Sequence, residues 1–373
     1  MKKKKANEIA SFFVGPEVCI KDNIPPIWVL CFFIKRKKIM SYFPPPPPPP
    51  LCLSGADNGI KPRDAWVDIM RVLAMLFIMI QHTPTHHSPV TGMTRAGVFF
   101  FFMAAGYFLA RNYAAASSPV SWLNWKKAAL ILCAYVFWIF VSMALFGFPS
   151  TLLGWMANMG IGHVPLGVIL WFLRDLMVFV LISGILFRIP RPCLAVLCLA
   201  ALIPFSTESS IRLTFQYGDM ACNIIHPRGL GAFALGMLLS PYSLKELKDM
   251  VEKAWVYVLI VFPAVFAWEV YHRGHESALF LCMGVLWIAS CSLLATRYFR
   301  KFSSFCARLG PSIFLVYAAH TLVYRFLIRL GLPEGSYWMW GLAVPAVFLV
   351  LSGVYFLLGR ICPGVLRYIA LKS

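Results

Sequence analysis

The stretch Trp66–Thr83, WVDIMRVLAMLFIMIQHT, has the composition of a membrane span but carries ionisable side chains. Leu, Ile, Met, Phe and Val make up most of it, and Asp68, Arg71 and His82 interrupt the apolar run. An ionisable group inside a span costs about 2.5–3.5 kcal/mol on insertion scales, so it normally faces a partner or a water-filled cavity. The stretch therefore predicts a transmembrane helix whose charged side chains have a partner or a cavity.

The spacing of Arg71 and His82 sharpens this prediction. At about 100° per residue, the interval between them is three helical turns plus roughly 20°, so both side chains share one face about 16 Å apart. Arginine suits phosphate because its guanidinium is always charged, and histidine suits proton transfer. Two interpretations stay open: a functional face, or an arginine that reaches the lipid headgroups and a histidine bonded to a neighbouring helix.

The composition extends the membrane reading to the whole chain. Hydrophobic residues make up 60% and charged residues 13%, with a mean hydropathy of +0.74, whereas about a quarter of a soluble chain is charged. The formal charge of +19 suggests nucleic acid or a membrane surface, but cytoplasmic loops of membrane proteins also collect Lys and Arg. We therefore expect a lipid bilayer and no nucleic acid as the partner.

Apolar segments recur from Trp66 to the C-terminus and indicate an all-α, polytopic integral membrane protein with about ten transmembrane helices. The predicted spans are 67–83, 94–111, 128–147, 166–187, 192–205, 226–240, 254–271, 277–296, 310–328 and 338–359.

The distribution of basic residues predicts the orientation of these spans. With the N-terminus in the cytoplasm, most Lys and Arg fall in inside loops. The outside loops then hold Arg95, Arg212, Arg273 and Arg329. The positive-inside rule thus predicts both termini in the cytoplasm, and we expect the protein in the plasma (inner) membrane.

Residues 1–63 differ from the membrane domain that we predict at 64–373. They hold MKKKK, then KRKK at 35–38, then seven consecutive prolines ending at Pro50. A proline tract is a stiff spacer, and the segment lacks an apolar run long enough to span a bilayer. We expect a disordered, basic, proline-rich extension. Two explanations of this segment stay open. It is either a docking tail, or the product of an upstream start codon with Met40 or a later codon as the true start.

Four motifs, in order along the chain, carry a resemblance to a known family. WVDIMRVLAMLFIMIQH resembles the opening of the acyltransferase family 3 integral membrane proteins, which place Asp-x-x-Arg, Ala and then His as Asp68, Arg71, Ala74 and His82 stand here. The segments GVFFFFMAAGYFLA, LWFLRDLMVFVLISGIL and FLVYAAHTLV are similar to three further family motifs.

The resemblance implies a membrane O-acyltransferase, an enzyme that passes an acyl group, usually acetyl, from cytoplasmic acyl-CoA to a hydroxyl of an extracytoplasmic glycan or glycolipid. It implies Arg71 as the donor-side arginine, His82 as the essential catalytic histidine and Asp68 as a supporting residue. Acyl-CoA is then a donor substrate, and no bound cofactor is expected.

The chain departs from the family pattern at two places. Ala105 stands where a serine is usual, and Lys126 and Lys127 stand where the family has arginines, with Leu130 at a further common arginine position. Lysine binds phosphate as a point charge, so we expect Lys126 and Lys127 to contact CoA.

The remaining candidates lie in three other spans. Arg174 and Asp175 are expected to bind the acceptor or to pair across helices. Tyr317 and His320 are expected to line the cavity or to make interhelical hydrogen bonds. A further pair, His226 and Arg228, opens the sixth predicted span and is expected to face the cavity.

Other chemistries lack their motifs. The sequence has no GxSxG, HExxH, phosphate-binding glycine loop or dinucleotide fingerprint, and its Cys and His residues lack zinc-site spacing, so we expect no metal. The alternative function is a transporter or flippase of a polar or polyprenyl-linked solute, which would favour broken helices in paired halves. We see no such pairing.

Overall fold

The computed structural model describes residues 64–84, 95–116, 121–147, 170–202, 214–217, 220–223, 226–272 and 277–369. The chain divides into two units, residues 1–60 and 61–373, and every described residue belongs to the second. The predictions for the N-terminal extension therefore lie outside the described residues and stay predictions.

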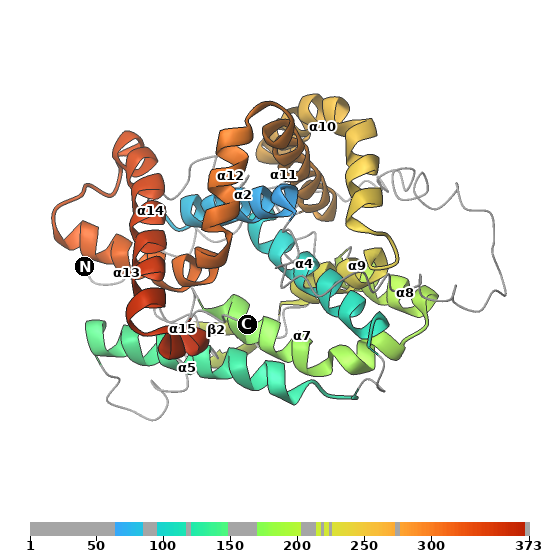
Figure 1. Cartoon of the computed structure of the whole chain (residues 1–373), viewed down its shortest axis with the longest axis horizontal. Coiled ribbons are helices and arrows are strands. Elements are labelled where there is room, and N and C mark those ends of the chain that lie inside the picture. The colour runs from blue at the N-terminus through green and yellow to red at the C-terminus, as the bar shows by residue number, and fades with distance from the viewer. Residues whose placement is uncertain are drawn as a thin grey trace, which may run out of the picture. The chain divides into compact units, whose positions relative to one another are not determined.

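Helices dominate the described part of the chain (Figure 1). Their bounds are α2 Ala65–Gln81, α4 Ala96–Ala114, α5 Trp125–Phe146, α7 Trp171–Arg188, α8 Arg191–Leu202, α9 Pro227–Leu239, α10 Leu244–His272, α11 Ala278–Tyr298, α12 Arg300–Leu309, the 3-10 turn η4 Gly310–Ser312, α13 Ile313–Arg329, α14 Tyr337–Ile361 and α15 Pro363–Ile369.

Each of the ten predicted spans coincides with one helix of this series, in the order α2, α4, α5, α7, α8, α9, α10, α11, α13 and α14. Among the described residues, five segments are long and apolar enough to cross a membrane: α5, α10, α11, the continuous run Arg300–Arg329 and α14. The helices α8 and α9 are apolar but shorter. The helical class is thus confirmed, and the crossing of the bilayer by all ten stays a prediction.

Three elements were missing from the prediction. Helix α12 has a strongly amphipathic sequence, RKFSSFCARL, and α15 has only seven residues, so neither shows a long apolar run. A two-stranded antiparallel hairpin, β1 Thr214–Tyr217 and β2 Met220–Asn223, lies where only a loop was expected. This small hairpin leaves the helical class of the fold unchanged, and the sequence Gly-Asp at 218–219 is a known hairpin signal.

Helix α2 lies at the centre of the helical unit. It packs against α4, α11, α12, α13 and α14, and Ile69, Met75 and Met79 are fully buried along it. The indole of Trp66 donates to the carbonyl oxygen of Ala289 in α11 at 3.0 Å. Central burial of α2 explains why its few polar side chains meet protein groups from several helices.

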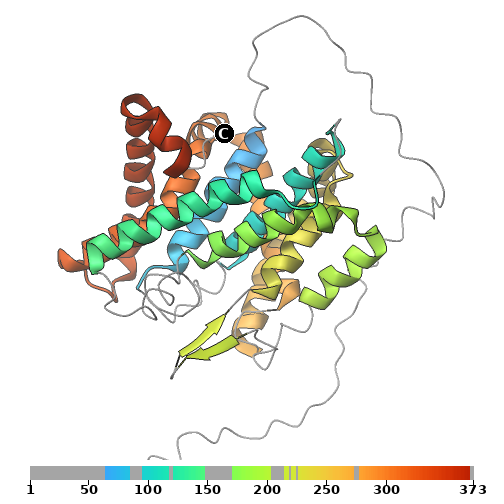
Figure 2. The ribbon, with the colours of Figure 1, turned by 90° about the horizontal axis from the view of Figure 1, so that it is seen from below.

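Helices α4 and α9 approach each other backbone to backbone. A Cβ added at Gly106 would collide with the carbonyl oxygen of Phe233, and one added at Gly236 would collide with that of Met103. Small residues allow such close crossing of helices in membranes. The glycine that follows Ala105 in the second motif is therefore required by packing. Helices α5 and α7 form another neighbouring pair, as Figure 2 shows.

The outer faces of several helices carry large apolar side chains. Tyr257 and Ile260 of α10 are 73% and 69% exposed, and Leu342 of α14 is 76% exposed. Contiguous apolar surface of this kind is unfavourable in water and is the surface that a lipid-facing helix presents.

Contacts between helix ends agree with the predicted connectivity. The Arg111 guanidinium at the end of α4 donates to the carbonyl oxygen of Tyr242 at 2.9 Å, and both positions are predicted to lie inside. Asp175 and His226, both predicted to lie near the outside, are hydrogen-bonded to each other at 2.9 Å. Each contact therefore joins two helix ends that alternating spans place on the same side of the membrane. Which side is the cytoplasm is predicted from the loop charges alone.

Candidate active site

The first part of the candidate site is the Asp68–Arg71 pair on α2. Arg71 Nη1 donates to Asp68 Oδ1 at 3.3 Å, and the guanidinium lies 5.5 Å from the ring centre of Phe108. The Asp68 side chain is only 2% exposed and that of Arg71 is 34% exposed. One turn of helix thus holds a buried carboxylate and a cation that reaches outward from it.

Asp68 also fixes the junction between α12 and α13. A Cβ at Gly310 would lie 2.9 Å from Asp68 Oδ1, so the carboxylate packs directly on the η4 backbone. The pair therefore lies where the predicted inner end of α2 meets the turn that begins α13, and the supporting role expected for Asp68 stays a prediction.

A cavity of about 870 Å³ opens beside Arg71. Its wall is mainly aromatic and aliphatic, and comes from α4, α7, η4, α13 and α14. Two guanidinium groups belong to it, from Arg71 and from Arg360 at the end of α14, and the Tyr317 side chain lies on its wall. Ala105 lines the same cavity, so a serine hydroxyl at that position would have faced it.

The structure brings His82 and His320 together. Their ring centres are 5.4 Å apart, although they come from α2 and α13. His82 is the C-cap of α2, because the helix ends at Gln81, slightly earlier than the predicted 83. His82 is not among the residues that line the cavity. Tyr317 is, and its ring centre lies 6.2 Å from that of His320, which in turn contacts His82.

The tautomer of His320 follows from its partners. Its Nδ1 lies 2.7 Å from the carbonyl oxygen of Tyr317 and 3.2 Å from that of Val316, and carbonyls only accept, so Nδ1 carries the hydrogen. In the neutral ring Nε2 is then a bare acceptor, and this fully buried atom has no hydrogen-bond partner among the described residues. A buried polar atom without a partner is costly and indicates an absent ligand or a functional role.

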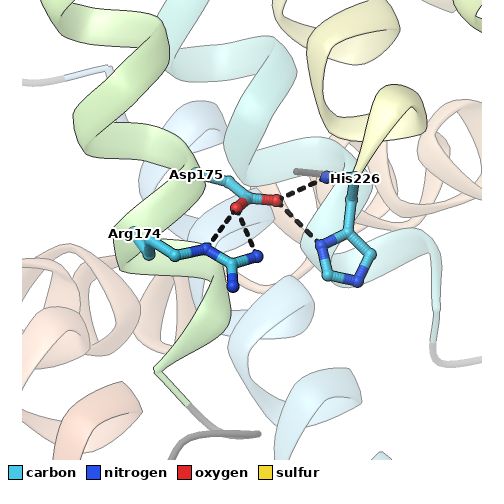
Figure 3. Close-up of polar contacts among 3 residues, drawn as sticks. All are labelled: Arg174, Asp175 and His226. Atoms are coloured by element: carbon cyan, nitrogen blue, oxygen red, sulfur yellow. Dashed lines mark hydrogen bonds and ion pairs between the residues drawn. The ribbon is translucent and has the colours of Figure 1, made fainter. Parts of the chain in front are cut away.

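A second polar cluster combines Arg174, Asp175 and His226 (Figure 3). Arg174 donates through Nε and Nη2 to Asp175 Oδ1 at 2.9 and 2.8 Å. His226, the N-cap of α9, places its backbone nitrogen and its Nδ1 at 3.0 and 2.9 Å from Asp175 Oδ2. The Asp175 carboxylate is fully buried. Its hydrogen bonds link α7 to the start of α9 and orient the His226 ring.

Lys126 and Lys127 lie apart from the cavity. Both are exposed at the start of α5, and neither lines the cavity beside Arg71. Their expected contact with CoA stays a prediction that this geometry does not support directly. Arg360 lines the cavity, although the sequence analysis assigned it to no site. Its charge had been explained by the positive-inside pattern of the C-terminal segment.

The comparison with known protein families identifies the class. An acyltransferase domain, that of acyltransferase family 3, matches residues 64–359. No curated protein and no solved structure matches the chain. The chain belongs to acyltransferase family 3. It is therefore an integral membrane acyltransferase with an acyl donor and an acyl acceptor as substrates, and the transporter alternative loses its support.

Proposed function

We propose that the protein transfers an acyl group, most simply acetyl, from cytoplasmic acyl-CoA to a hydroxyl of an extracytoplasmic glycan or glycolipid. The observation that carries this proposal is a cavity with two arginines whose wall includes Tyr317, together with the ring contacts that follow from Tyr317. These contacts lead from Tyr317 to His320 and then to His82 at the end of α2.

The donor end suits a nucleotide thioester. A volume of about 870 Å³ falls in the range of roughly 300–1,000 Å³ usual for small-molecule sites. Arg71 and Arg360 supply charge for phosphates, and guanidinium groups bind phosphate bidentately. The apolar wall between them and Tyr317 suits the pantetheine arm. In this proposal acyl-CoA enters from the cytoplasm, and both termini lie on that side of the plasma membrane.

His82 carries the chemistry of the proposal. It acts either as the base that takes the proton of the acceptor hydroxyl or as a nucleophile that carries the acyl group for a time. In both cases the acyl–sulfur bond breaks, an acyl–oxygen bond forms, and the hydroxyl proton finally resides on the CoA thiol. In this proposal His320 positions His82 through the contact of their rings, whose centres lie 5.4 Å apart.

The acceptor side of the proposal uses Arg174 and Asp175 together with the inner groups Tyr317 and His320. Arg174 and Asp175 lie near the start of α7, which is the predicted outer end of that span. Their charges and hydrogen-bonding groups suit the hydroxyls of a polar acceptor arriving from outside.

The test is acyl transfer from radiolabelled acetyl-CoA in membranes that contain the protein. His82→Gln keeps hydrogen-bonding capacity but has no proton-accepting group near neutral pH, so turnover should fall by about 10²–10⁴-fold or more. CoA binding should persist, because Arg71 lies about 16 Å away. Unchanged turnover in a well-expressed Gln variant would refute the proposed role of His82.

A further inference from the structure

The hydrogen-bonded pair Asp175–His226 has the geometry of a base and its orienting group. Asp175 Oδ2 lies 2.9 Å from His226 Nδ1, and the carboxylate is fully buried while the imidazole is 31% exposed (Figure 3). The donor-side chemistry of Arg71 and His82 uses neither residue.

The partners of Asp175 fix the tautomer of His226. Arg174 donates two N–H groups to Oδ1, which keeps Asp175 a carboxylate that only accepts. The ring nitrogen Nδ1 of His226 must therefore donate to Oδ2, and in the neutral ring the lone pair is on Nε2. A buried carboxylate that holds an imidazole in one tautomer is the arrangement by which an Asp–His pair prepares a histidine to accept a proton.

The position of the pair is at the predicted outer end of the spans. Asp175 lies in the second turn of α7 and His226 caps the start of α9, whereas His82 ends α2. In the alternating topology, all three belong to the same side of the membrane.

Aromatic rings at the start of α7 lie beside this pair and beside Tyr317. Phe172, three residues before Asp175, has its ring centre 5.3 Å from that of Tyr317, and the Tyr317 ring centre is 6.2 Å from that of His320. The indole of Trp171 lies 4.1 Å from the His226 ring, centre to centre. An aromatic face next to an oriented imidazole suits the ring of a sugar, whose C–H groups pack on aromatic rings while its hydroxyls reach polar groups.

We infer that His226, oriented by Asp175, is the general base that activates the acceptor hydroxyl. This inference rests on the proposed function and deepens it, because it assigns to His82 the role of acyl carrier. In the first step a His82 nitrogen bonds to the acyl carbon, the acyl–sulfur bond breaks, and the thiolate takes the ring proton. In the second step His226 Nε2 takes the hydroxyl proton as the oxygen bonds to the acyl carbon. The bond to His82 breaks, and the proton passes to the released imidazole.

A purely structural role makes a different prediction. Asp175 also links α7 to the start of α9, so its loss could loosen the fold and lower every activity together. The two roles separate when the acyl acceptor is varied. Hydroxylamine is a nucleophile at neutral pH without loss of a proton, whereas an alcohol and water need a base.

The experiment uses the full chain in lipid nanodiscs with labelled acetyl-CoA and three acceptor probes: methyl glucoside, water and hydroxylamine. His226→Gln should lower transfer to methyl glucoside and to water by about 10²–10⁴-fold, and leave formation of acetohydroxamate within severalfold of the parent. Asp175→Asn should show the same selectivity, because an amide favours the wrong tautomer of His226.

Ser277→Ala is the matched control. Ser277 caps another outer helix end, that of α11, by accepting the backbone N–H of Phe280 at 3.1 Å. Its loss should change all three transfers by the same factor.

Two results would overturn the inference: an equal loss of all three transfers in His226→Gln, or no loss in any. A parent protein that acetylates no probe, including hydroxylamine, would instead refute the proposed function itself. His82→Gln completes the set, since it should abolish transfer to hydroxylamine as well.

Discussion

Replacing Arg71 with lysine isolates what the guanidinium contributes to donor binding. Lysine keeps the positive charge near Asp68 but loses the planar fork, and with it the contact over the Phe108 ring. A hydrogen bond to a charged group contributes about 1.5–3 kcal/mol, which corresponds to about 10- to 140-fold in affinity. Because the Arg71 side chain is 34% exposed, solvent screening favours the lower end, and we expect about a tenfold loss.

The assay compares kcat/KM for acetyl-CoA with that for S-acetylpantetheine, which lacks the nucleotide and its phosphates. Arg71→Lys should lower the first value about tenfold and leave the second unchanged. Arg111→Lys is the control, because Arg111 bonds to Tyr242 at the same predicted side and does not line the cavity. If Arg71→Lys weakens both substrates equally, or neither, then Arg71 does not bind the phosphates.

Three further predictions follow from the fold. Arg360→Ala should lower the affinity for acetyl-CoA by at most about fivefold, because the residue is exposed, and calorimetric titration with CoA should detect this loss. A larger loss of affinity for S-acetylpantetheine than for acetyl-CoA would contradict a phosphate contact. Gly106→Ala should lower the unfolding temperature, at a cost of about 1–3 kcal/mol, whereas Gly353→Ala, with open space around its Cβ, should not; equal thermal shifts would refute the close crossing of α4 and α9. A cysteine placed at Leu330 should react with an impermeant maleimide from outside intact cells and one at Lys245 should not; the reverse pattern would overturn the predicted orientation.

The sequence was sufficient for the helices that consist of long apolar runs. Each predicted span corresponds to a helix in the structure. Backbone N–H and C=O groups in a bilayer must be hydrogen-bonded within the segment, so a long apolar run is a strong signal for a helix. The amphipathic helix α12 and the hairpin β1–β2 gave no such signal, because neither contains a long apolar run, and α12 packs on α2 and α11.

The candidate site was predictable only where its residues share a local motif. Asp68 and Arg71 are one helical turn apart, and their contact follows from spacing alone. The meeting of His82 with His320 depends on how α2 and α13 pack, which a single sequence does not encode locally. The role of Asp175 as a shared partner of Arg174 and His226 depends likewise on the packing of α7 against α9.

The backbone contact between α4 and α9 has a consequence for how the two substrates influence each other. Gly106 and Gly236 bring the two backbones into direct contact, so we expect α4 and α9 to move together. Phe101 and Phe108 of α4 belong to the wall of the cavity, and His226 lies at the start of α9. If the donor binds in this cavity and the acceptor binds at His226, as we propose, a donor that shifts the wall should shift the imidazole too. By thermodynamic reciprocity, an occupied acceptor position would then change the affinity for the donor by the same factor.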